Sequence, residues 1–367
     1  MHKVLQPASL AGMALRNRLI RSATWDSTAD ENGAVTDRSV AIYENLAAGG
    51  VGLIVTGYAF VSRHGQAVFG QYGAYGDEMI PGLRRLAQAA HRHGAKIAAQ
   101  IVHAGAFSTF LARTGQEQLA PSPIEIRHRH REITEEDIEK IIGDFAKAAV
   151  RVRDAGFDAV QLHGAHGYLM SQFLSTITNL RKDRWGLTPE DRRRFHVETV
   201  RRVRAAVGSD FPLMIKFGVM DDNDGGATLE EGIAALQAMA EVGLDAAEIS
   251  GGIGSGKRAP IQVVADDQTE VTYYRERAAR AKAALDIPIA VVVGIRCLET
   301  AEDIIQSGDA DFVALSRPLI RQPGLVNKWL AGDLSRATCI SCAKCLTLVS
   351  KGDPLECGED RRIREEG

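Results

Sequence analysis

Short apolar runs recur eight times along the chain, and this repetition narrows the possible folds more than any other feature. The runs cover residues 19–24, 51–56, 96–101, 158–162, 212–217, 246–250, 288–293 and 311–315. Their length and composition are typical of strands buried on both faces of a parallel sheet. Helical periodicity fills several of the intervals, at 77–93, 134–155, 189–207, 229–242 and 272–285. Several of these helical stretches start at a capping threonine or end at glycine.

Eight strand and helix units predict an α/β chain that folds as a single (β/α)8 TIM barrel. An open doubly wound sheet fits less well, because no Gly-x-Gly-x-x-Gly motif follows the first strand. Pro7 and Gly12 lie between short apolar pieces in Leu5–Arg16, which predicts an N-terminal hairpin that caps the barrel. Two long excursions, 104–133 and 169–188, would form walls of a pocket. We expect the barrel to occupy 1–335 and a cysteine-rich extension to occupy 336–367.

The charge balance argues against a nucleic-acid or membrane function. The 367 residues carry a net charge of −3, and 45% of them are hydrophobic. The basic clusters 127–131 and 192–194 are interpreted as solvated loop and helix faces. The N-terminus lacks the basic and then apolar pattern of a signal peptide, so a cytoplasmic location is expected.

Three protonatable side chains follow the fourth predicted strand directly: His163, His166 and Tyr168. In a barrel, the carboxyl ends of the strands form the active-site mouth. Two imidazoles and one phenol could donate hydrogen bonds to a carbonyl oxygen and supply a proton beside it. Zinc binding is less favoured, because no nearby acidic residue or cysteine completes a ligand set. The histidines could also be satisfied core residues.

Other strand ends carry small or polar residues that suit a planar cofactor with a phosphate tail. Gln100 could pair with the edge of a heteroaromatic ring, and Lys216 could neutralise negative charge on it. The seventh and eighth strands end where barrels usually bind phosphate. Lys216 and Arg317 could instead be ordinary rim charges. The candidate cofactor residues are Ser22, Ala23, Thr24, Gly57, Gln100, Lys216, Gly294, Ser316 and Arg317.

These motifs resemble the Old Yellow Enzyme family of FMN-dependent ene-reductases. The most specific match is the stretch from His163-Gly-Ala-His166-Gly-Tyr168 through Asn179-x-Arg181-x-Asp183-x-Trp185-Gly186. Further matches are Asn17-Arg18, Gly33, Gln100-Ile-Val-His103-Ala-Gly105 and Ala314-Leu-Ser-Arg317-Pro-Leu. The resemblance covers Leu5 to about Leu330.

The resemblance implies an NAD(P)H:flavin oxidoreductase that reduces the C=C bond of small enones or enoates. FMN would supply hydride from N5, His163 and His166 would bind the substrate carbonyl, and Tyr168 would protonate Cα. The cofactor residues above would hold FMN in the barrel mouth. Two departures stand out. Trp25 replaces the Thr or Cys often found beside the flavin, and Lys216 replaces an Arg, so a bidentate fork is lost.

Four of the five cysteines cluster at the C-terminal end, with the pattern Cys339-x2-Cys342-x2-Cys345-x11-Cys357. Close spacing in a cytosolic chain favours a metal site over disulfides. The pattern resembles the [4Fe–4S] segment of the 2,4-dienoyl-CoA reductases and trimethylamine dehydrogenase. Zinc and free thiols remain alternatives. A cluster would need an external electron-transfer protein as partner, or it would be a retained remnant.

Two other functions stay open. One is an oxidative flavin dehydrogenase of an amine or methyl donor, with Trp25, Tyr58 and Phe69 as candidates for an aromatic cation box. The other is a flavin and iron–sulfur electron-transfer protein. A 2,4-dienoyl-CoA reductase role is weakened, because the glycine-rich loop Gly251–Gly256 lacks the histidine that those enzymes use there. A homo-oligomer is expected.

Overall fold

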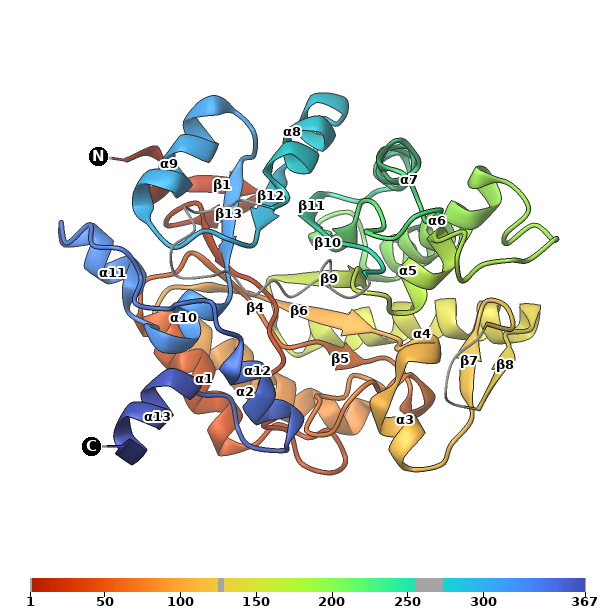
Figure 1. Cartoon of the computed structure of the whole chain (residues 1–367), viewed down its shortest axis with the longest axis horizontal. Coiled ribbons are helices and arrows are strands. Elements are labelled where there is room, and N and C mark those ends of the chain that lie inside the picture. The colour runs from red at the N-terminus through yellow and green to blue at the C-terminus, as the bar shows by residue number, and fades with distance from the viewer. Residues whose placement is uncertain (1, 125–128, 255–272, 367) are drawn as a thin grey trace.

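Eight parallel strands close into a barrel in the computed structural model, which describes residues 2–124, 129–254 and 273–366. The neighbouring order is β4-β3-β13-β12-β11-β10-β9-β6, and pairing of β4 with β6 closes the ring. The (β/α)8 TIM barrel predicted from the sequence is therefore confirmed, and each strand lies within or close to its predicted run (Figure 1). The barrel strands are β3 (Leu19–Arg21), β4 (Leu53–Val55), β6 (Lys96–Val102), β9 (Ala159–Gly164), β10 (Leu213–Gly218), β11 (Ala246–Ser250), β12 (Ile289–Val292) and β13 (Phe312–Leu315).

Helices connect the strands and cover the outside of the barrel (Figure 1). Threonine caps start α4, α6 and α7, each with an acidic residue at the third position that completes a capping box. The predicted start of one helix, Thr272, lies outside the described residues. The connecting helices are α1 (Asp37–Ala48), α2 (Ile80–His91), α4 (Glu135–Asp154), α6 (Pro189–Val207), α7 (Leu229–Glu241), α8 (Arg275–Ala284), α9 (Leu298–Ser307), α10 (Arg317–Arg321) and α11 (Leu325–Leu330).

The N-terminal hairpin is formed by β1 (Ala8–Leu10) and β2 (Met13–Leu15), which pair antiparallel as expected. The excursion after β6 contains α3 (Thr109–Arg113), β7 (Gln118–Ala120) and β8 (His130–Glu132). The short strand β5 (Ala59–Phe60) pairs with the end of β6, and α5 (Leu169–Leu174) follows β9. The described residues contain no helix that is both long and apolar enough to cross a membrane.

The C-terminal segment contains α12 (Lys344–Ser350) and α13 (Gly358–Glu366) and packs onto the barrel. Leu355 N–H donates to Asp26 O at 3.1 Å, and Ala337 N–H donates to Arg296 O at 2.8 Å. Arg321 adds an ion pair with Asp360 at 2.7 Å. The segment is therefore anchored to loops at the carboxyl ends of barrel strands.

Candidate functional site

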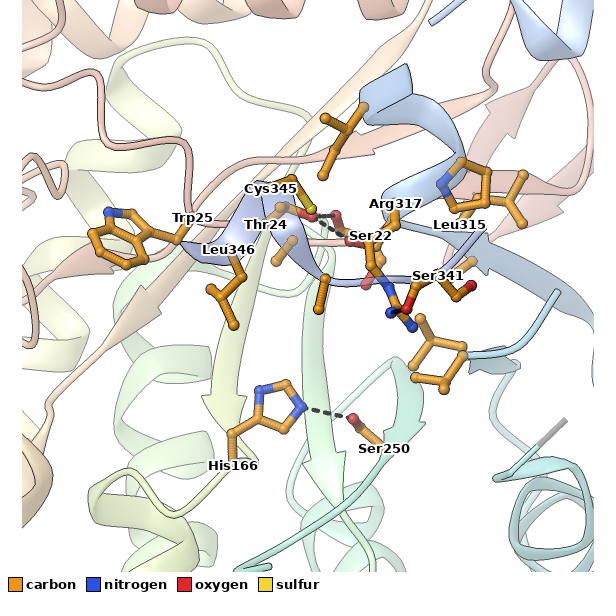
Figure 2. Close-up of a pocket in the computed structure, with 18 of the residues that line it drawn as sticks. Ser22, Thr24, Trp25, His166, Ser250, Leu315, Arg317, Ser341, Cys345 and Leu346 are labelled. Atoms are coloured by element: carbon orange, nitrogen blue, oxygen red, sulfur yellow. Dashed lines mark hydrogen bonds between the residues drawn. The ribbon is translucent and has the colours of Figure 1, made fainter. Parts of the chain in front are cut away.

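A cavity of about 640 Å³ opens at the carboxyl ends of the barrel strands. The C-terminal segment supplies one of its walls, through Ser341, Cys345, Leu346, Val349 and Leu355 (Figure 2). Most of the residues predicted from strand ends meet here. Those that line the cavity are Ser22, Ala23, Thr24, Trp25, His166, Tyr168, Lys216, Gly294, Ser316 and Arg317.

Three predicted residues do not line the cavity. His163 is buried behind its lining, in contact with the rings of Tyr58, His166 and Tyr168. The space beside the Gly57 Cα is closed by the Thr24 carbonyl, which would lie 2.9 Å from an added Cβ. Gln100 is also fully buried.

The histidines and two tyrosines form one aromatic cluster. The centroid of His163 lies 5.1 Å from that of His166 and 4.9 Å from that of Tyr168. The Tyr168 hydroxyl donates to the Tyr58 hydroxyl at 3.1 Å. His166 Nε2 is hydrogen-bonded to Ser250 Oγ at 2.8 Å, which leaves Nδ1 as its other polar atom (Figure 2). The cluster concentrates protonatable groups at one side of the cavity.

Burial keeps both histidines neutral. It lowers the pKa of His163 well below its ordinary value and, with the charge of Lys216 as a smaller cause, lowers the pKa of His166 to about 3. His163 Nδ1 accepts a hydrogen bond from Ala165 N–H at 3.3 Å, so the ring proton belongs on Nε2. Burial also raises the pKa of Tyr168, which keeps its phenol protonated at neutral pH.

A chain of buried polar side chains lies next to the cavity, on β10, β11, β9 and β6, with Ser22 directly after β3. Lys216 Nζ donates to Ser22 Oγ at 2.7 Å and lies 3.1 Å from Glu248 Oε1. Gln161 Nε2 donates to Glu248 Oε2 at 3.1 Å, and Gln100 Nε2 donates to Gln161 Oε1 at 2.7 Å. Gln100 Oε1 has no hydrogen-bond partner among the described residues. A buried acceptor of this kind suits a ring N–H donor, as a flavin offers.

The phosphate side of the site lies at the ends of β12 and β13. Val293 and Gly294 have φ values of 81° and 90°, and this left-handed conformation is rare for a β-branched residue. Successive backbone N–H groups in unusual turns are suited to binding anions. Arg317 also faces the cavity, although its Nη1 donates to Ser341 O in the C-terminal segment at 2.9 Å. The predicted cofactor residues thus fit a planar group with a phosphate.

Trp25 lies at the cavity wall, where its Nε1 donates to Phe69 O at 3.2 Å. The indole packs with Tyr58 and Tyr168 against a small cluster that includes Val68. Phe69 itself is 42% exposed and packs edge-on against Phe110 at 4.9 Å. Phe69 is therefore not part of the cavity lining, and an aromatic cation box of Trp25, Tyr58 and Phe69 is not assembled there.

The four clustered cysteines line one small cavity together with Arg317 and Arg321. None of them forms a disulfide. Burial raises the pKa of Cys339 and of Cys345. In the described residues, no three His, Cys, Asp or Glu side chains converge closely enough to hold a single metal ion. Cys345 lines both this cavity and the large one.

Comparison with known proteins identifies the family. The model of the NADH:flavin oxidoreductase / NADH oxidase family matches residues 3–333. The chain belongs to this family. The resemblance to the Old Yellow Enzyme family is confirmed.

Individual relatives and solved structures agree with this family assignment. A metal reductase from Desulforamulus reducens is 38% identical over 359 residues, covering 96% of this chain and 53% of the relative. A 2-naphthoyl-CoA reductase complex has a TM-score of 0.89 at 28% identity and covers 97% of this chain and 56% of that one. An old yellow enzyme homologue from Zymomonas mobilis, at 21% identity, covers 92% of this chain and 96% of that one with a TM-score of 0.78, and supports the fold alone. The chain spans about half the length of the first two proteins.

Several residues of the site were not predicted from the sequence as catalytic or cofactor residues. Ser250 ends β11, so a full survey of strand ends would have included it. Tyr58, which follows β4, was considered only for an aromatic cation box, whereas it lies beside Tyr168 at the cavity wall. Gln161 and Glu248 are polar residues inside otherwise apolar strands, and that mismatch is the signal which could have revealed them. Arg296 also lines the cavity and donates to Cys339 O at 3.2 Å.

Proposed function

We propose that this flavin oxidoreductase reduces the C=C bond of small α,β-unsaturated carbonyl compounds, with NAD(P)H as the reductant. The observation that carries the proposal is the cluster of two neutral histidines and a protonated tyrosine at one side of a large cavity. An electron carrier without a substrate needs no proton donor beside its flavin. The cluster therefore favours an enzyme that adds both hydride and proton.

The histidines bind and polarise the substrate carbonyl in this proposal. His163 lies just behind the cavity lining, against the rings of His166 and Tyr168, and offers its Nε2–H because its Nδ1 already accepts from Ala165 N–H. The substrate carbonyl must therefore reach past that lining to bind His163. His166 is held by Ser250, so its ring is oriented before substrate arrives. Hydrogen bonds to a developing enolate oxygen stabilise the transition state, and loss of one such donor typically costs ~10²–10³ in rate.

Tyr168 is the proposed general acid for Cα. Its side chain is partly buried at the cavity wall, and burial raises the pKa of the phenol, so the proton is held until a substrate takes it. Bound FMN would supply the hydride, from N5 to Cβ. Gly294, Ser316 and Arg317 would hold the phosphate, Gln100 and Lys216 would lie beside the ring, and the remaining contacts would come from Ser22, Ala23 and Thr24. Trp25 narrows the substrate side.

The cysteine segment is proposed to hold a [4Fe–4S] cluster. Each thiolate of such a cluster binds a different iron, so its four ligands stand further apart than those of one tetrahedral zinc. The four cysteines line one small cavity, and their spacing resembles the [4Fe–4S] segment named above, which supports the cluster over zinc. Electrons would come from or go to an external protein, and a cytoplasmic homo-oligomer remains our expectation.

The oxidative alternative, an amine or methyl-donor dehydrogenase, is less favoured. It would need a box of aromatic faces for a cation, and Phe69 does not contribute one to the cavity.

Separate half-reactions test the proposal. Under anaerobic conditions, Tyr168→Phe should leave flavin reduction by NAD(P)H nearly unchanged and slow reoxidation by an enone by ~10²–10⁴. Tyr75→Phe is a matched control, because Tyr75 is outside the cavity lining and bonds Arg63 and Asn32 instead. Unchanged enone reoxidation in Tyr168→Phe would remove Tyr168 as the acid. Absence of turnover across an enone panel in the wild-type chain would overturn the proposed reaction.

A further inference from the structure

Glu248 is a buried carboxylate in the middle of a barrel strand, directly beside the candidate flavin site. It is 1% exposed. Oε1 accepts from Ser22 Oγ at 2.5 Å and pairs with Lys216 Nζ at 3.1 Å, while Oε2 accepts from Gln161 Nε2 at 3.1 Å. A buried charge is tolerated only when it is paired and hydrogen-bonded, and Glu248 meets both conditions.

Strand register brings these groups together. Lys216 on β10 is aligned with Glu248 on β11 and with His163 on β9. Lys216 also lines the cavity, and its positive charge contributes to the lowered pKa of His166. The charge of Lys216 therefore acts on groups in and around the cavity.

The carboxylate also fixes the direction of the hydrogen bonds beyond it. An ionised carboxylate can only accept, so Gln161 must present its Nε2 to Glu248 and its Oε1 to Gln100. Gln100 then uses its Nε2 for Gln161 and keeps its Oε1 as an acceptor. A neutral amide at position 248 would not impose this order.

We propose that Glu248 is a positioning residue for the flavin, which offsets the charge of Lys216 at the cavity wall and orients Gln161 and Gln100. This inference rests on the proposed placement of FMN in the cavity. With Glu248 in place, Lys216 and Glu248 form an ion pair of nearly zero net charge beside the flavin. Lys216 alone would present an uncompensated positive charge. The consequence is a site that stabilises negative charge on the flavin less than Lys216 by itself would.

Sulfite titration of the FMN-loaded protein measures this property without enone turnover. The sulfur lone pair of sulfite forms a bond to flavin N5, and the displaced electron pair leaves negative charge on the ring. A nearby uncompensated cation stabilises that adduct. Glu248→Gln should therefore tighten the sulfite dissociation constant about tenfold or more, as read from bleaching of the flavin absorbance.

Two further variants separate charge compensation from a structural role. Glu248→Asp keeps the charge and should give a sulfite dissociation constant close to that of the wild type. The double variant Lys216→Gln with Glu248→Gln should not bind sulfite more tightly than the wild type, because it has no Lys216 charge left uncompensated. An unchanged constant in Glu248→Gln, or the same gain without Lys216, would overturn the proposal.

Folding failure is also informative. If Glu248→Gln does not fold with FMN but the double variant does, an unpaired buried Lys216 is the cause, and the pairing is supported. If Glu248→Gln, the double variant and Glu248→Asp all fail to fold, Glu248 is a packing residue and the inference fails. These measurements need only bound FMN. They therefore test the role of Glu248 even if the protein fails to reduce enones.

Discussion

The Tyr168 hydroxyl lies 3.1 Å from the Tyr58 hydroxyl, and both side chains line the same cavity. The bond lowers the pKa of Tyr168 and partly offsets the larger opposite effect of burial. A phenolate left at Tyr168 after proton transfer would accept this bond from Tyr58. The pair thus joins the proposed acid to a second hydroxyl that stabilises its conjugate base.

Tyr58→Phe should weaken proton delivery without removing the acid. The pKa of Tyr168 would rise further, so the alkaline limb of the enone half-reaction should move to higher pH. The rate should fall by about tenfold. Stopped-flow reoxidation across a pH series measures both effects. A limb that stays in place, or one that moves to lower pH, would show that Tyr58 does not act on Tyr168.

Cys345 contributes to two cavities, so loss of its thiol should affect both cofactors. We expect Cys345→Ser to reduce iron and sulfide content and also to lower the amount of FMN retained per chain. Cys297→Ser is the matched control, because Cys297 is outside both linings and contacts Thr300 at the start of α9. Iron, sulfide and FMN content per chain, measured after anaerobic purification, test this prediction. Wild-type protein with FMN but without iron would contradict the cluster.

The barrel could be predicted because each buried parallel strand leaves a local apolar run, and helices leave periodicity and capping residues. Most of the residues predicted from strand ends, from Ser22 to Arg317, then line the cavity. Contacts between distant segments left no such local pattern. The bond from Arg317 to Ser341 and the wall formed by Leu346 and Val349 depend on how the C-terminal segment packs.

The partners of single polar residues inside the strands also could not be predicted from the sequence. Glu248 and Gln161 are stable there only because register places Lys216 and Gln100 beside them. These contacts join residues from four strands, and a sequence read strand by strand does not show them. Gly57 illustrates the opposite case. Its position near a strand end predicted that it would line the cavity, but the space beside its Cα is closed by the Thr24 carbonyl.

Trp25 should limit the size of substrates. Replacement by the smaller threonine removes the indole and its bond to Phe69 O, which opens the wall near Val68. We expect Trp25→Thr to raise kcat/KM for bulky enones relative to a small one by about tenfold, an amount typical of a few methylene groups in a pocket. Steady-state assays with a size series test this. An unchanged ratio would mean that Trp25 does not limit the pocket.

His196 on α6 should make the fold sensitive to acid. The side chain is fully buried, neither ring nitrogen has a hydrogen-bond partner among the residues that the structure describes, and burial lowers its pKa to about 3. The unfolded chain binds a proton near pH 6.5, whereas the folded chain does not until about pH 3. Stability from this group is therefore intact above pH 6.5 and falls as the pH drops toward 3. At pH 5 the loss is about 2 kcal/mol.

His196→Leu should remove that loss, because leucine has no proton to bind and suits the apolar contact with Phe217. Urea unfolding at pH 5 and at pH 8 measures the free energy of unfolding for both proteins. The variant should gain about 2 kcal/mol more at pH 5 than at pH 8. Since the buried His163, His166 and His103 also have lowered pKa values, the variant keeps part of the acid sensitivity. An equal gain at both pH values would show that folding does not lower the pKa of His196.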